Sequence, residues 1–297
     1  MTTQADILRA VATHSTGACP LQDFVALELH GPDAMGFAQA QFAGDLRPLS
    51  VGHWQWNCWL SSQGRVIALL LLLRTDADRL CMVLPDPHAE ALAQQLRRYV
   101  FRSKVTIERA AVSIYGGRTG LATPLARSGA METDFDGAAV VRLGGCMGRS
   151  VHVAAACPDV ELERARLWPA ADIVDAIPWL SGAAIEAWIP QALGLDRLAA
   201  FSTAKGCYPG QEIVARTHFL GRNKRHLMRA TLDATSAPVA GERLLDDTAS
   251  DREAAAMVVS SALAGDHALA LVVAREGVPS TLRLASSGAT AILAELD

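Results

Sequence analysis

The sequence lacks the features that would place the protein in a membrane or on an export route. Its most apolar run, Val66 to Leu73, is far shorter than the roughly 20 residues of a transmembrane helix. The segment from Met1 to Asp6 has no basic region and no apolar stretch follows it, so we expect no signal peptide. The sequence predicts a cytoplasmic protein without a membrane partner.

A strong excess of charge of one sign is also missing. The 297 residues carry a formal net charge of −4, so the chain has no overall basic field to attract a phosphate backbone. We expect no direct nucleic-acid partner. The length is sufficient for two or more domains.

Local clusters of metal-binding residues are absent too. The six cysteines form no C-x-x-C pair and no cluster with histidine: Cys19, Cys58, Cys81, Cys146, Cys157 and Cys207. Zinc and iron–sulfur sites of ordinary spacing need such groups. The sequence therefore predicts no stably bound metal, and free thiols of this kind suit a reducing compartment.

Strand and helix patterns alternate along the first third of the chain. Strands are predicted at 24–29, 54–60, 65–73, 81–84 and 105–107, and helices at 34–42 and from Asp86 through Leu92 and Leu96. This order predicts an α+β fold with helices on one face of an antiparallel sheet.

Trp54 and Trp56 project to the same face of the strand predicted at 54–60. Their rings could line a slot for a flat heterocycle, or they could fill a core between sheet and helix. Core packing is favoured, because alternating aromatic residues usually mark a core.

The later parts of the chain have a different character. Residues 116–149 are rich in Gly, Ala and Thr, which predicts loops and short strands at a subdomain junction. After Thr217, β-like runs at 227–232, 255–260 and 268–274 predict a small β-barrel. We divide the chain into an α+β region of two subdomains at 1–216 and a barrel domain at 217–297.

The segment from Lys205 to His226 holds more reactive side chains than any other. Gly206 and Gly210 bracket Cys207 and Tyr208, a spacing typical of a tight loop.

A short helix is predicted directly after this loop, from Gln211 to Arg216, with Glu212 and Arg216 one turn apart. Cys207 then precedes a helix N-terminus and has Lys205 nearby, a setting that favours the thiolate. The alternative is a simple chain reversal with a small core cysteine.

A block of basic residues follows in this acidic chain: Arg216, Arg222, Lys224, Arg225, His226 and Arg229. Such a block can bind the carboxylates of a ligand, dock an acidic partner protein, or form a solvated domain junction. The sequence leaves these uses open.

The string K-G-C-Y-x-G-Q-E-x-x-A-R, with Gly and N-K-R after it, resembles the signature of the YgfZ family of folate-binding proteins of iron–sulfur cluster maintenance. That family is related in fold to the T-protein, the aminomethyltransferase of the glycine cleavage system. Three weaker matches occur in family order, at 39–45, 102–105 and 189–191. The resemblance implies a T-protein-like fold, with antiparallel sheets and a C-terminal barrel, and tetrahydrofolate as the cofactor.

The resemblance also implies roles for individual residues. Cys207 would be the reactive thiol of a motif loop made of Lys205, Gly206, Tyr208, Gly210, Gln211, Glu212 and Arg216. Family members carry E-A-G-x-P where this chain has 174–178, and Asp175 is the acidic residue of that stretch. Folate and its carboxylates would be bound by Lys104, Asp175, Arg222, Lys224 and Arg225.

The resemblance is compatible with two functions. The favoured one is a folate-binding accessory factor for assembly or repair of iron–sulfur clusters in client enzymes, among them radical enzymes that methylthiolate tRNA. The alternative is a tetrahydrofolate-dependent aminomethyl transferase. T-proteins carry an acidic residue in place of Cys207, and their separate catalytic aspartate motif has no match here, which favours the thiol-dependent role.

Overall fold

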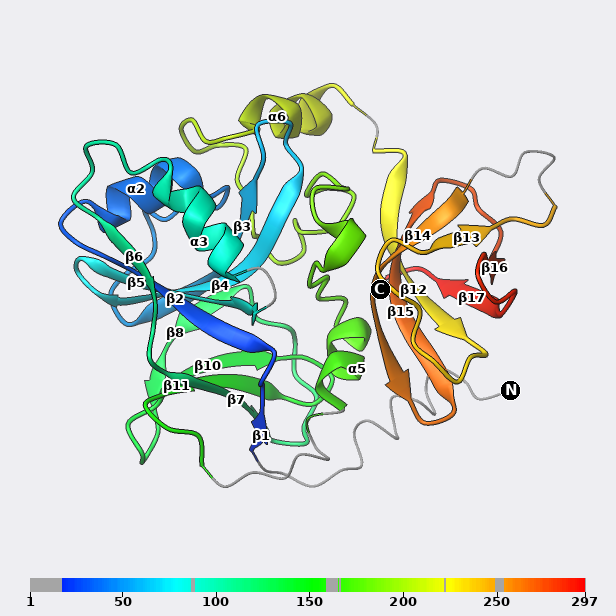
Figure 1. The fold of residues 1–297 in the computed structure, drawn as a ribbon, viewed down its shortest axis with the longest axis horizontal. Helices are drawn as coiled ribbons and strands as arrows, with labels where there is room; N and C mark the ends of the chain where they lie inside the picture. Colours follow the sequence, from blue (N-terminus) through cyan, green and yellow to red (C-terminus); the bar gives the residue numbers. More distant parts are fainter. Residues whose placement is uncertain are drawn as a thin grey trace.

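The computed structural model describes residues 18–86, 89–158, 165, 167–221, 223–248 and 254–296. These residues form two open sheets and a closed barrel, with the barrel to one side of the two sheets (Figure 1). The α+β class and the C-terminal barrel predicted from the sequence are confirmed.

The first sheet has six antiparallel strands in the order β6-β2-β5-β4-β3-β8. In that order they are Thr106–Arg109, Phe24–His30, Arg79–Pro85, Val66–Asp76, His53–Leu60 and Ser128–Ala130. The apolar run of β4 forms a central strand, which explains why it is buried on both faces.

Two helices cover one face of this sheet, α2 at Ala34–Gln41 and α3 at Ala89–Arg97. Phe37 of α2 and Leu92 and Leu96 of α3 pack there against sheet residues such as Leu70. The opposite face carries Trp54 and Trp56, which are 1% and 0% exposed, so the expectation that these rings pack in a core is confirmed.

A second antiparallel sheet has five strands in the order β1-β7-β11-β10-β9. They are Cys19–Pro20, Ser113–Arg118, Arg149–Ala154, Ala139–Gly144 and Glu132–Thr133. Helix α5, Leu167–Val174, packs on it, and Trp168 lies directly over Gly116, where an added Cβ would stand 2.3 Å from the ring. Residues 116–149, which were expected to hold loops and short strands, contribute short strands to this sheet, β9 and β10 among them.

The barrel closes in the order β12-β15-β14-β13-β16-β17. Its strands are Arg225–Leu232, His267–Arg275, Ala254–Ala264, Arg243–Leu245, Thr281–Leu284 and Thr290–Ala294. Helix α5 and the 3₁₀ turn η2, Gly182–Ala184, pack against β14. One apolar cluster thereby continues from β3 and β4 through α5 to the outer face of the barrel.

Helix α6, Gln211–Phe219, lies over the turn between β3 and β4 at the top of Figure 1. It is the helix expected after the cysteine loop, and it continues three residues past Arg216. Along the described parts of the chain, no helix has the length and apolar character needed to cross a membrane.

Candidate functional site

The loop that precedes α6 is fixed by close backbone packing. Gly210 caps the helix with φ +76°, a left-handed conformation that favours glycine. A Cβ added there would lie 2.5 Å from both the Gly64 Cα and the Ser61 carbonyl oxygen. The expectation of a tight loop with close backbone approach is met at Gly210, and the neighbour it approaches is the β3–β4 turn.

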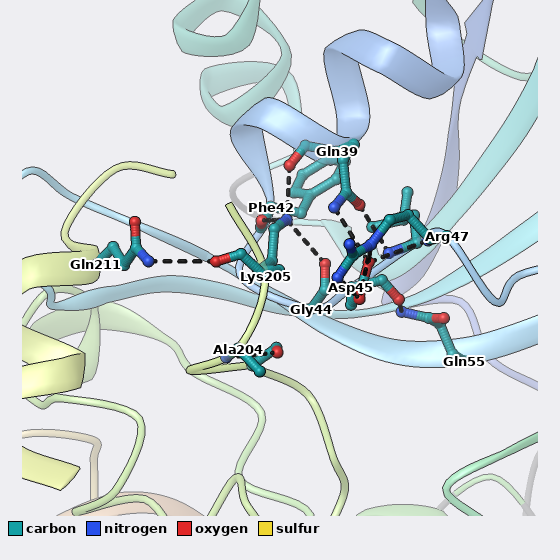
Figure 2. A network of polar contacts seen from close by, with 11 residues as sticks. Gln39, Phe42, Gly44, Asp45, Arg47, Gln55, Ala204, Lys205 and Gln211 are labelled. Carbon is teal, nitrogen blue, oxygen red and sulfur yellow. Dashed lines mark hydrogen bonds and ion pairs between the residues drawn. The ribbon is translucent and has the colours of Figure 1, made fainter. Parts of the chain in front are cut away.

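Lys205 anchors the same loop to the end of α2. Its side chain is buried, and Nζ donates to the carbonyl oxygens of Gln39, Phe42 and Gly44 at 2.6, 2.7 and 3.0 Å (Figure 2). Carbonyls at a helix C-terminus lack helical partners and attract a cation, which suits this contact. Burial lowers the pKa of Lys205 to about 8.

A second layer of hydrogen bonds supports these carbonyls. The Gln39 amide accepts from the Leu46 N–H at 2.7 Å and donates to Asp45 Oδ1 at 3.1 Å. Asp45 also binds Arg47 at 2.6 Å, and this hydrogen bond holds the pKa of Asp45 well below its usual range. The structure thus joins the segments 39–45 and 205–212, which lie more than 150 residues apart in sequence (Figure 2).

Tyr208 and Gln211 secure the other side of the loop. The Tyr208 hydroxyl donates to the Ser202 carbonyl at 2.8 Å, and its ring lies 5.2 Å from Lys205 Nζ. Burial raises the pKa of Tyr208, so it remains a neutral donor. Gln211 Nε2 donates to the Lys205 carbonyl at 3.3 Å.

Cys207 and Gly206 are exposed between these buried anchors. Of the other cysteines, Cys19, Cys58 and Cys81 are buried, Cys146 is half-buried and Cys157 is exposed. Burial raises the pKa of Cys81 to about 12, which keeps that thiol protonated. The loop therefore presents one accessible sulfur on a rigid support.

The described residues contain no group of three or more His, Cys, Asp or Glu side chains that could hold a metal ion. The arrangement around Cys207 suits contact between its thiol and a group carried by another molecule.

The residues of the basic block lie in different environments in the structure. Arg216 lies with Glu212 on the exposed side of α6, and Lys224 is exposed just before the barrel. Arg225 stacks over the Trp188 ring at 5.4 Å. Arg222 lies outside the described residues.

Lys104 lies apart from the cysteine loop. It is exposed, and its backbone N–H donates to Asp33 Oδ2 at 2.7 Å, at the N-terminal end of α2. Lys205 binds the other end of this eight-residue helix, roughly 12 Å away. The assignment of Lys104 to folate binding together with the basic block stays a prediction.

Both carboxylate oxygens of Asp175 have hydrogen-bond partners within the protein. Its Oδ2 binds Arg149 at 2.6 Å and its Oδ1 accepts from the Cys146 N–H at 2.7 Å. Arg149 is fully buried and also binds Asp172 at 2.6 Å. Two carboxylates share one guanidinium here, and burial raises the pKa of Asp172 to about 6 although Arg149 opposes the shift.

Sequence reasoning missed Arg149 and Asp172 as members of this cluster. Arg149 stood at the end of the segment 116–149, which was expected to hold loops and short strands, and no motif connects it with residues 172 and 175. The alternation of the strand Arg149–Ala154 was the available signal.

No protein-family model matches the chain. Among solved structures, it is similar to the glycine cleavage system aminomethyltransferase T from Bartonella henselae, with a TM-score of 0.70 over 100% of this chain and 90% of that one. The chain has a T-protein-like fold. The sequence identity with that T-protein is 16%, so this likeness concerns the fold alone.

Proposed function

We propose that this protein is a folate-binding accessory factor that supports assembly or repair of iron–sulfur clusters in client enzymes. The observation that carries the proposal is the exposed Cys207 thiol on a loop whose neighbours Lys205 and Tyr208 are both buried and hydrogen-bonded. A thiol held in this way can contact a cluster, a persulfide or a partner cysteine without rearrangement of the loop.

The proposed partner class rests on the basic residues that follow that thiol in the sequence. Arg216 and Lys224 are exposed close to it in sequence, and they favour an acidic partner surface. The clients would include the radical enzymes that methylthiolate tRNA. The protein would act in the cytoplasm, and the client enzyme, not this protein, would contact the RNA.

The folate part of the proposal rests on the T-protein-like fold. Folate needs cations for its glutamate carboxylates, and Lys224 and Arg225 are the described members of the basic block for that role. Asp175 is the residue assigned to the pterin N–H donors, and each of its oxygens already accepts one hydrogen bond, from Arg149 and from the Cys146 N–H. A pterin would have to share one of these oxygens with its present partner.

The decisive experiment compares two exposed cysteines in cells that lack the protein. We expect tRNA methylthiolation and other cluster-dependent activities to fall in such cells. Plasmid-borne Cys157→Ala should restore them, because Cys157 is also exposed but is not part of the motif loop. Cys207→Ala should not. Normal methylthiolation without the protein, or full rescue by Cys207→Ala, would rule out the thiol-dependent role.

A second candidate, aminomethyl transfer to tetrahydrofolate, is favoured by the fold likeness to an aminomethyltransferase. Purified protein would then release a one-carbon unit from a methylamine-type donor to tetrahydrofolate. Equal turnover by the wild type and Cys207→Ala would select this function over the accessory role.

A further inference from the structure

The loop that joins α3 to β6 presents a basic and aromatic surface. Its exposed side chains form what we call the α3–β6 patch: Arg98, Tyr99, Phe101, Arg102 and Lys104. No aspartate or glutamate occurs between Glu90 and Glu108 in the sequence. The patch is therefore a local concentration of positive charge in a chain whose formal net charge is −4.

The loop is held firmly in place. Arg97 donates from Nε and Nη2 to the Ile107 carbonyl at 2.9 and 2.7 Å, which ties the end of α3 to β6. The Tyr99 ring meets the buried Trp59 ring edge to face, with centroids 6.3 Å apart. A surface that is already ordered loses little conformational entropy when a partner binds.

The cations of the patch have no partners within the described parts of the chain. No side-chain hydrogen bond or ion pair joins Arg98, Arg102 or Lys104 to another described residue. Other exposed arginines of α3 and the first sheet do pair with carboxylates: Arg79 with Glu28, Arg97 with Glu90 and Arg109 with Asp86. Three cations without internal partners create a positive local field, which attracts a surface that carries carboxylates.

The aromatic side chains of the patch are exposed beside these cations. Phe101 is 84% exposed and Tyr99 is 44% exposed. Aromatic residues and arginine are enriched where proteins bind one another, and burial of an exposed aromatic ring contributes favourable free energy. The patch therefore offers an apolar contact together with three positive charges.

Carboxylates border the patch and restrict the partner. The side chains of Glu90 and Glu108 are 62% and 55% exposed, and Asp33 Oδ2 accepts a hydrogen bond from the Lys104 N–H at 2.7 Å. A long phosphate backbone would extend from the three cations onto these carboxylates, which repel it. A short acidic protein segment can contact the cations alone, so the charges favour a protein over a nucleic acid.

The patch lies close enough to the cysteine loop for one partner to cover both. The Lys104 N–H binds Asp33 at the N-terminal end of α2, and Lys205 binds carbonyls at the C-terminal end of this eight-residue helix. A standard protein interface covers about 800 Å² on each partner, roughly 30 Å across, and the helix is only roughly 12 Å long.

We propose that the α3–β6 patch docks an acidic segment of a partner protein in which an apolar side chain stands between carboxylates. The carboxylates pair with Arg98, Arg102 and Lys104, and the apolar side chain packs against Phe101 and Tyr99. This surface goes beyond the function proposed above, because it requires neither folate nor a reactive Cys207.

Fluorescence anisotropy with two labelled peptides tests this docking surface. One peptide repeats Glu-Leu-Asp and the other repeats Glu-Ser-Asp, so they have equal charge and differ in their apolar side chains. We expect the leucine peptide to bind about threefold more tightly or better, and its affinity to fall as the salt concentration rises, because salt screens exposed charges. Cys207→Ala should bind it as the wild type does, so the outcome is independent of the proposed thiol chemistry.

Charge reversal in the double variant Arg98→Glu/Arg102→Glu should weaken binding of the leucine peptide about tenfold or more, and Phe101→Ser should weaken it about threefold. The matched controls are Arg243→Glu on β13 and Phe135→Ser, because both side chains are exposed outside the patch. Neither control should change binding. All of these variants should keep the wild-type melting temperature, since substitutions of exposed side chains have small effects on stability.

The proposal is overturned if the two peptides bind equally, or if the double variant binds the leucine peptide as well as the wild type does. Oligouridylate and vesicles that contain phosphatidylserine test the other classes of occupant. If either binds more tightly than the leucine peptide and loses this binding in the double variant, the patch serves a nucleic acid or a membrane and the proposal fails.

Discussion

At the scale of single residues, Lys205 has a structural role, although it is charged and lies two positions from the proposed reactive residue, Cys207. Its ammonium group donates to three backbone carbonyls, and the hydrogen bonds to Phe42 and Gly44 are buried. Lys205 therefore positions the loop, and Cys207 two residues later is left free to react.

Replacing Lys205 by methionine should destabilise the protein by about 1–3 kcal/mol, because the carbonyls lose their donor. Chemical denaturation would measure this loss. Lys224→Met is the matched control, since Lys224 is exposed, and its effect should stay within about 0.5 kcal/mol. Equal effects of the two substitutions would contradict the anchoring role.

Asp172 gives the stability a pH dependence of known sign. Its pKa is raised to about 6 in the folded protein, above the ordinary value near 4. The folded protein therefore holds more protons than the unfolded chain between about pH 4 and 6, and the contribution of Asp172 to stability falls as the pH rises through this window.

Asp172→Asn removes this titration. We expect the unfolding free energy of the wild type, relative to Asp172→Asn, to decrease by about 2 kcal/mol between pH 4 and pH 6.5. A difference that stays constant across this range would show that Asp172 keeps an ordinary pKa.

At the scale of elements, one buried arginine connects the second sheet to α5. Arg149 of β11 binds Asp172 in α5 and Asp175 just after it. Arg149→Met would leave two buried carboxylates without their cation, and we expect a loss of about 3–5 kcal/mol in thermal or urea unfolding.

Arg142 on the neighbouring strand β10 is the natural control for that substitution. It also pairs with a carboxylate, Glu132, but both side chains are 54% exposed. Arg142→Met should cost about 0–1 kcal/mol. A comparable loss at Arg142 would mean that burial is not what distinguishes the two pairs.

The elements also show what the sequence could predict. Helix α2, the hairpin of β3 and β4, and the long barrel strands follow regular patterns and were expected at nearly their observed bounds. Short strands were expected at 116–149, but their pairing into a second sheet was not, because glycines interrupt the strand patterns. Gly116 and Gly117 are there to admit the rings of Trp168 and His152, which come from other elements.

The candidate site was predictable only in part, for a similar reason. The motif indicated the loop and α6, but the acceptors of Lys205 are backbone carbonyls near residue 40, and no side-chain pattern marks them. Asp175 was expected to face a ligand, but it lies just after α5 and pairs with Arg149 of the second sheet, a contact that no local pattern predicts. The domain boundary between residues 216 and 217 stays a prediction. Helix α6 extends across this position.

At the scale of the whole molecule, one apolar cluster joins parts that are far apart in sequence. Residues of both sheets, α5 and the outer face of the barrel, such as Leu271, belong to it. We expect a single cooperative transition in scanning calorimetry, with equal calorimetric and van't Hoff enthalpies. Separate melting of the barrel would contradict this coupling.

The three carbonyls around Lys205 have a further consequence. Converging backbone oxygens at such distances are also the means by which potassium channels replace the water around a potassium ion. Lys205→Ala would remove the tethered ammonium and leave an incomplete coordination shell. We expect the melting temperature of that variant, but not of the wild type, to rise when potassium or ammonium replaces choline at constant ionic strength. The lysine would then be a covalently attached substitute for a bound monovalent ion.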